Sequence, residues 1–219
     1  MRSNHHTTAK AMVALVVLLL GTASASFSAF SPSFQGGVPS SEQERRVAAI
    51  REALLRLPYY SVFDFLAFSY EKGTVTLGGY GYHGSLKSDA ERAVKRVSGV
   101  DQVVNNIAIL PASFSDDDLR WRTYYAIYTN DFLAKYAPGG GVFWGHRHAM
   151  RGGMFGPFAA LPGEEPLGTF PIHIVVEGGR IRLLGIVDNE TDKTVANLAA
   201  RGVSGSFGVT NDLVVETTK

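Results

Sequence analysis

The sequence predicts an α+β fold built from two copies of one unit with the order helix, strand, strand, helix, strand. Three observations lead to this prediction. The stretch KGTVTLGG at 72–79 returns as GGRIRLLG at 178–185, alternating apolar residues precede and include each stretch, and a helix-type apolar period follows both. The copies keep register without a gap at an offset of 106 residues, from Gly73 to Gly179, which is too long a period for a solenoid. We therefore expect two related domains.

The first unit is expected to begin with a helix and a hairpin. The run SEQE at 41–44 has the pattern of a capping box, and an apolar stripe follows it up to Pro58. Apolar residues then alternate at 66–70 and 75–79 around the turn Lys72-Gly73, which is the pattern of a β-hairpin.

A second helix and a last strand are expected after the hairpin in each unit. Ser85 and Asn189 are the expected N-caps, and a V-S-G tripeptide that ends in Gly99 or Gly205 is the expected stop. The last strands are expected at 103–109 and 209–215.

The first helix of the second unit departs from the repeat. The segment that lies 106 residues after the first helix, 149–163, contains Gly and Pro and is a poor helix. Ser115 followed by three Asp residues supplies a cap and an acidic first turn, so we expect the helix at 119–136. It either takes the role of the first helix or bridges the domains. Its expected apolar stripe is Trp121, Tyr125, Tyr128 and Phe132.

The glycine pattern resembles a known family. The order of an apolar strand, G-x-[VI]-x-L-x-G, a helix, V-S-G and V-x-N is similar to that of the BON domain. The resemblance implies domains at 42–110 and at 116–216, the second with an insertion at 137–168. It also implies an exported bacterial envelope protein without enzymatic activity, often with tandem domains, linked to osmotic or envelope stress and to phospholipid contact. The glycines that carry the pattern, and whose role is structural, are Gly73, Gly79, Gly99, Gly179, Gly185 and Gly205.

The segment 1–25 has the order of a cleaved signal peptide. Arg2 and Lys10 precede an apolar run at 11–21, and Ala23-Ser24-Ala25 offers small residues to a signal peptidase. The alternative is an uncleaved membrane anchor, but the strongly apolar part is about half of the roughly 20 residues that a spanning helix needs. We expect a periplasmic or exported protein, peripheral rather than transmembrane.

Charge and cysteine content exclude several classes of protein. Removing 1–25 leaves 19 of the 21 basic residues against 20 acidic ones, so the chain lacks the basic surplus that a nucleic-acid-binding protein needs. The absence of cysteine excludes a disulfide framework, a Cys-ligated metal and the thiol of a lipoprotein anchor.

Candidate binding residues lie on the uncovered sheet faces and in the insertion. Two helices cover only one face of a three-stranded sheet, so the other face is left for a partner, a ligand or the sister domain. The insertion mixes aromatic and basic residues, which suits a lipid interface, but it also suits a loop that packs over the sheet edge. The candidates are Phe65, Tyr80 and Tyr82 on the first face, Arg180 and Arg182 on the second, and Phe143, Trp144, Arg147 and Arg151 in the insertion.

No active site, metal site or cofactor site is predicted. His146 and His148 have no spacing that matches a zinc pattern, no G-x-S-x-G elbow occurs, and the acids at 116–118 fit a helix first turn. Two functions remain open. One is an envelope module that binds phospholipid or an envelope protein. The other is a structural interaction module that self-associates or joins a secreted assembly without lipid contact, and an enzyme is a distant third.

Overall fold

The computed structural model describes residues 16–17, 41–137 and 166–216 of the 219-residue chain. Most of the insertion, and with it Phe143, Trp144, Arg147 and Arg151, lies outside these residues, as do His146 and His148.

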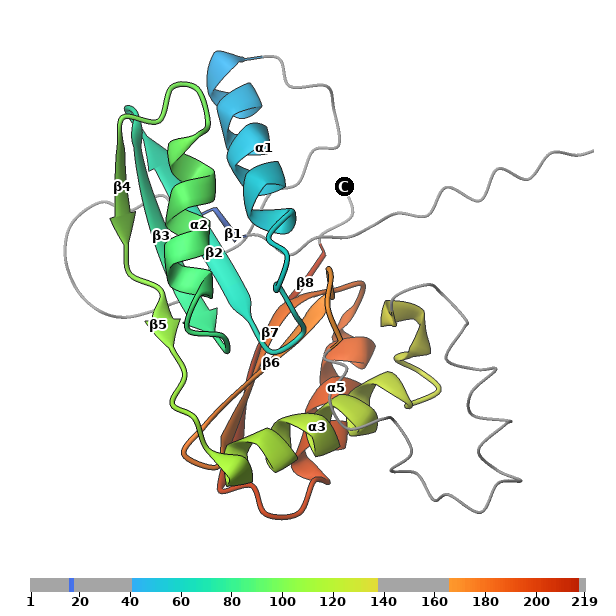
Figure 1. The fold of residues 1–219 in the computed structure, drawn as a ribbon. Helices are drawn as coiled ribbons and strands as arrows, with labels where there is room; N and C mark the ends of the chain where they lie inside the picture. Colours follow the sequence, from blue (N-terminus) through green and yellow to red (C-terminus); the bar gives the residue numbers. More distant parts are fainter. Residues whose placement is uncertain (1–15, 18–40, 138–165, 217–219) are drawn as a thin grey trace, which may run out of the picture.

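The first unit has the predicted order αββαβ (Figure 1). Its last strand is split in two around Asn106, where Asn106 N donates to Leu77 O and Ile107 N donates to Asn105 Oδ1. A two-residue strand, β1 (Val16–Val17), pairs in parallel with the edge of β2 and lies in the segment predicted to be a signal peptide. The elements are α1 (Glu42–Leu55), β2 (Phe65–Glu71), β3 (Thr74–Gly81), α2 (Leu86–Lys95), β4 (Gln102–Asn105) and β5 (Ala108–Ile109).

The second unit repeats this order, so the chain folds as two BON-like αββαβ units in an α+β fold. In both units the hairpin is antiparallel and the last strand pairs in parallel with the second strand of the hairpin. The elements are α3 (Phe114–Tyr128), the short 3-10 helix η1 (Ala134–Tyr136), β6 (Ile172–Glu177), β7 (Arg180–Val187), α5 (Glu190–Arg201) and β8 (Gly208–Val215).

Two of the expected helix caps are confirmed. Ser41 and Glu44 form the capping box of α1, and the Asn189 side chain accepts a hydrogen bond from Asp192 N at the start of α5. Ser85 precedes α2 as expected, but its side chain makes no capping hydrogen bond.

The prediction for α3 was wrong at both ends. The N-cap is Ser113 rather than Ser115, since the Ser113 side chain accepts the hydrogen bond from Asp116 N. The helix ends at Tyr128 because Asn130 accepts from Phe132 N and closes a turn. Phe132 therefore does not continue the helical stripe and is 70% exposed. The buried apolar residues of α3 are Leu119, Tyr124, Ile127 and Tyr128.

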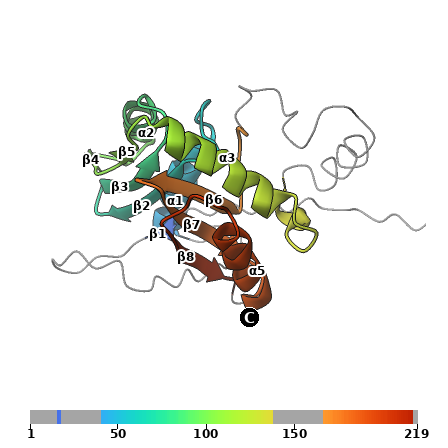
Figure 2. The same ribbon diagram turned by 90° about the horizontal axis from the view of Figure 1, so that it is seen from below.

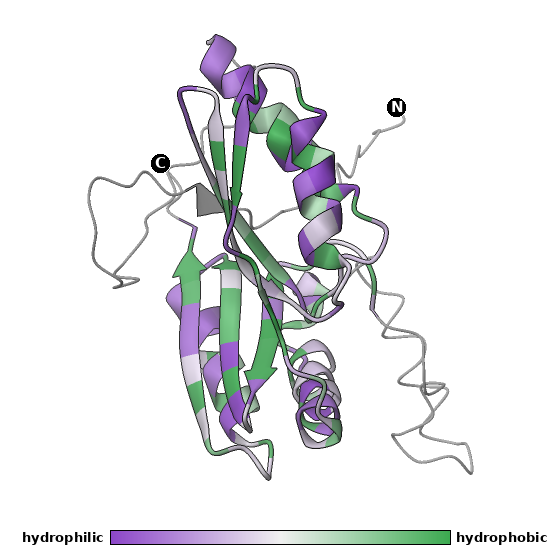
Figure 3. Cartoon of the chain, turned by 60° about the vertical axis from the view of Figure 1, so that its left-hand side comes forward, coloured by the Kyte–Doolittle hydropathy of each residue, from purple (hydrophilic) through white to green (hydrophobic). Residues whose placement is uncertain are grey.

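Each unit has a core between its helices and one face of its sheet. Leu77 in β3 and Leu183 in β7 are fully buried, one in each core, so the two copies place their matching leucines alike. Figure 3 shows hydrophobic residues interrupted by hydrophilic ones along the strands as well as along the helices, which fits elements with one buried and one less buried face.

One glycine in the second strand of each hairpin is required by a close backbone approach. Gly79 and Gly185 have φ of +117° and +127°, and a Cβ there would lie 2.0 Å from the carbonyl oxygen of Phe65 in β2 or of Pro171 just before β6. Any side chain would therefore clash with backbone in addition to its conformational strain. The other glycines of the pattern, Gly73, Gly99, Gly179 and Gly205, also have positive φ.

The chain between α1 and β2, residues 60–64, joins the two units. Val62 and Phe63 belong to the buried core of the second unit although they come from the first. Backbone hydrogen bonds run alongside, from Ile174 N on β6 to Val62 O (2.9 Å) and from Gly168 N to Tyr60 O (2.8 Å). This 60–64 segment therefore covers the free edge of β6.

The sheet faces opposite the helices also meet. Phe65 and Leu110 from the first unit form one buried cluster with Val175 from the second, and Ala67, Tyr80 and Leu184 pack against this cluster. Figure 2 shows α3 and α5 on one side of β6–β8 and the first unit on the other. Of the alternatives left open by the sequence, the structure thus has the two faces in contact with each other over this area.

Candidate functional site

The junction of the two units is held by a buried carboxylate. Asp64 accepts hydrogen bonds from Ser61 N (2.8 Å), Ser61 Oγ (2.7 Å) and Tyr82 N (2.7 Å). Burial raises the pKa of Asp64, and these donors partly offset the rise because they favour the charged form. The carboxylate ties the 60–64 segment to the end of β3.

His173 on β6 is the buried titratable group on the other side of this junction. Its Nε2 lies 3.4 Å from the Tyr60 hydroxyl, and its ring meets that of Phe65 edge to face. Nδ1 has no hydrogen-bond partner among the residues that the structure describes. Burial lowers the pKa of His173 to about 4, although the backbone carbonyls of Asp64 and Ser61 act in the opposite direction. His173 is therefore neutral at neutral pH.

The binding candidates predicted on the two sheet faces have different surroundings at this junction. Phe65 is buried, with 8% of its surface exposed. The Tyr80 hydroxyl accepts a hydrogen bond from Arg182 Nη1 (2.8 Å), which links the two sheets, and Arg182 also pairs with Asp212 (3.1 Å). Arg180 is exposed at the start of β7.

Tyr82 lies beyond the end of β3 and contacts the second unit. Its ring meets Phe63 edge to face, and the guanidinium of Arg120 lies 4.9 Å from its centre. Tyr82 is partly buried against the second core, so it does not share an open face with Tyr80.

Two acidic residues of α3 do more than occupy a helix first turn. The Asp116 carboxylate accepts from Gly178 N (2.9 Å) and Gly179 N (2.8 Å) and so binds the β6–β7 turn. Asp117 pairs with Arg120, whose Nη2 donates to Val176 O (2.5 Å). The sequence analysis missed the buried Arg120, for which the only signal was an acid three residues earlier.

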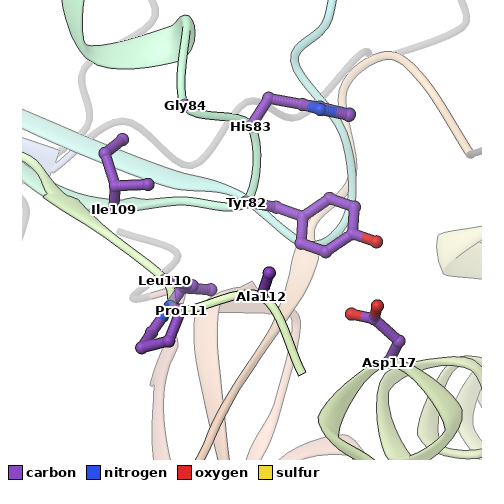
Figure 4. A pocket seen from close by; sticks show the side chains of 8 residues that line it. All are labelled: Tyr82, His83, Gly84, Ile109, Leu110, Pro111, Ala112 and Asp117. Carbon is purple, nitrogen blue, oxygen red and sulfur yellow. The ribbon is translucent and has the colours of Figure 1, made fainter. Parts of the chain in front are cut away.

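A pocket of about 420 Å³ lies beside this region (Figure 4). The Tyr82 ring and the Asp117 carboxylate point toward one another at its edge, but that carboxylate is paired with Arg120. The pocket offers no nucleophile with a matched base and no pair of carboxylates. Its lining residues are Tyr82, His83, Gly84, Ile109, Leu110, Pro111, Ala112 and Asp117.

Several large apolar side chains are exposed, and none of them is among the binding candidates selected from the sequence. Phe114 is 96% exposed, Phe207 is 77% exposed, and Phe132 and Leu198 are also largely in solvent. The repeat gave one signal that could have identified Phe207, because the offset of 106 residues aligns it with Asp101 in the first copy.

Within 41–137 and 166–216, no three His, Asp or Glu side chains come together as metal ligands. No helix in the described part of the chain is both long and apolar enough to cross a bilayer.

Comparison with known proteins places the repeat in a protein family. The model of the BON domain matches residues 42–111 and 158–217, which together exceed half of the chain. Two solved structures of CdsD, a structural protein of the Type III secretion system of Chlamydia trachomatis, are similar at 14% identity. One has a TM-score of 0.24 and covers 78% of this chain and 91% of that chain, and the other, of the C-terminal domain, has a TM-score of 0.23 with 78% and 97% covered. No curated protein matches the chain.

Proposed function

Since this chain belongs to the BON domain family and contains two copies of the domain, we propose that it is an exported, non-catalytic envelope protein that binds phospholipid membrane surfaces. The paired family match is the observation that carries the proposal, because BON domains are known in membrane- and envelope-associated proteins and are generally non-catalytic. The signal-peptide pattern of residues 1–25 supports export. In this proposal the protein acts in the cell envelope, including under osmotic or envelope stress.

The contact between the units limits where a membrane can bind. Phe65 and Val175 are buried between the two sheets, so the centres of these faces are not available to lipid unless the units separate. Arg180 stays exposed at the start of β7, where it is free to approach headgroup phosphates. We therefore place the proposed membrane contact at the ends of the strands rather than on the sheet faces.

Co-sedimentation with vesicles tests this proposal. The sample is the expected mature chain, residues 26–219, which retains every residue of the three buried clusters. We expect it to pellet with phosphatidylcholine vesicles and to do so more strongly when phosphatidylglycerol is included at low salt. If the folded protein stays in the supernatant with both, lipid binding is excluded, and a structural module that self-associates or binds an envelope protein takes its place.

A further inference from the structure

Among residues 41–137 and 166–216, the two most exposed phenylalanine side chains lie at the same end of the second unit. Phe114 is the first residue of α3, and two residues later the Asp116 carboxylate binds the backbone of the β6–β7 turn. Phe207 lies just before β8, and its N–H donates to Gly179 O of that turn (2.8 Å). Figure 1 shows the start of α3, this turn and the α5–β8 connection together at the lower end of the molecule. We call Phe114, Phe207 and the turn Gly178-Gly179 the aromatic tip.

The first unit holds acidic residues in the same two backbone positions. Asp101 N donates to Gly73 O (2.7 Å) just as Phe207 N donates to Gly179 O. A Cβ on Gly73 would meet the Asp101 carboxylate, whereas a Cβ on Gly179 would meet the Phe207 ring at 2.7 Å. The two positions are therefore equivalent in the fold.

The first residue of the first helix in each unit also differs, being an acid in the first unit and a phenylalanine in the second. Phe114 follows the N-cap Ser113 as the first residue of α3, and Glu42 follows the N-cap Ser41 as the first residue of α1. An acid at this position is favoured by the helix dipole, whereas an exposed phenylalanine gains nothing from it. The fold thus needs an aromatic residue at neither position, and their exposure calls for an explanation outside the folded chain.

We infer that the aromatic tip is the part of the protein that inserts into the membrane interface. This inference rests on the proposed function and assigns it to residues. Isolated rings that protrude from turns are accommodated at the level of lipid headgroups, where apolar side chains enter the boundary with the acyl chains. A protein partner would instead need a well-packed patch of roughly 800 Å² on each side. The tip offers two rings among small residues, Ser115, Gly178, Gly179 and Ser206.

The charges at the tip indicate how the binding depends on salt. Arg122 pairs with Asp118 (2.6 Å), and Arg180 stands opposite Glu177 across the hairpin. These two arrangements set positive against negative charge, and the Asp116 carboxylate adds a negative charge at the turn. Insertion of the rings, rather than attraction to anionic lipid, therefore supplies the tip's share of the affinity.

The test replaces each ring by the residue that the first unit carries in its place. In residues 26–219, the double variant Phe114→Glu, Phe207→Asp is expected to lower the partition onto phosphatidylcholine vesicles by about a hundredfold, since two buried rings are lost. The matched control is Phe132→Glu, Leu198→Asp, which adds the same charge at two other exposed apolar residues. It is expected to bind like the unmodified chain. Both doubles are expected to keep their unfolding midpoint, because all four side chains are exposed.

The outcomes separate this inference from the proposed function. If the unmodified chain and both doubles bind equally, lipid binding stands and the aromatic tip is not its contact. Equal losses in the two doubles would attribute the effect to added charge and would also overturn the inference. If the unmodified chain does not bind vesicles at all, both the proposed function and the inference about the aromatic tip are wrong.

Discussion

Replacing Phe63 by alanine is expected to lower the free energy of unfolding by about 3–5 kcal/mol. Phe63 is 1% exposed and lies in the core of the second unit, where its ring meets Trp121 and Tyr124 edge to face. The truncation leaves a cavity in that core although the residue belongs to the 60–64 segment of the first unit. Denaturant unfolding measures the loss of free energy. Faster hydrogen exchange in α3 and β6 would show that the loss affects the second unit.

The control is Phe114→Ala, which removes the same side chain from a position that is 96% exposed. We expect it to change stability by less than about 0.5 kcal/mol. If Phe63→Ala were equally mild, or if faster exchange were confined to the first unit, the 60–64 segment would not be part of the second core.

Acidification is expected to weaken the junction through His173. The pKa of His173 is lowered to about 4 by burial, so the unfolded chain takes up this proton near pH 6.5, well before the folded protein does. Its contribution to stability is constant above pH 6.5 and falls below it, by about 3 kcal/mol at pH 4. Acid titration followed by denaturant unfolding measures this fall.

Protonation of Asp64 has the opposite effect on stability in the acidic part of this pH range. Burial raises its pKa, so the folded protein binds this proton at a higher pH than the unfolded chain and gains stability as the pH falls toward 3.8. Tyr60, the other titratable group next to His173, has its pKa raised by burial and stays neutral throughout. The variant His173→Gln isolates the histidine, because it keeps Asp64 and removes only the imidazole. Identical pH profiles for the variant and the unmodified protein would show that His173 does not titrate in a buried site.

Local sequence patterns were sufficient to predict the repeated unit. The alternating apolar residues and the turn glycines specify the hairpins, and β2, β3, β6 and β7 form where the period of two predicted them. The prediction failed at α3, where two serines compete to cap the helix. Ser113 caps Asp116 N, and the Asp116 carboxylate binds the distant turn at Gly178 and Gly179, a contact that no local pattern indicates.

Contacts between the units could not be predicted in this way. The alternation along β2 correctly turned Phe65 away from α1 and α2, but it carries no information about what lies on the other side. Val62 and Phe63 are in a short stretch with no period, so nothing local indicates that they enter the second core. The aromatic tip was visible only after the structure showed that Asp101 and Phe207 make the same backbone hydrogen bond.

The position of residue 115 in the membrane-bound protein tests the account most directly. The chain has no cysteine, so Ser115→Cys in residues 26–219 gives a single labelling site beside Phe114, and Thr194→Cys gives a matched exposed site on α5. Each is labelled with an environment-sensitive fluorophore and mixed with phosphatidylcholine vesicles that carry a quenching lipid. The account predicts a blue shift and quenching at position 115 and neither at position 194. Quenching at 194 alone, or at neither site while the protein pellets with the vesicles, would contradict it.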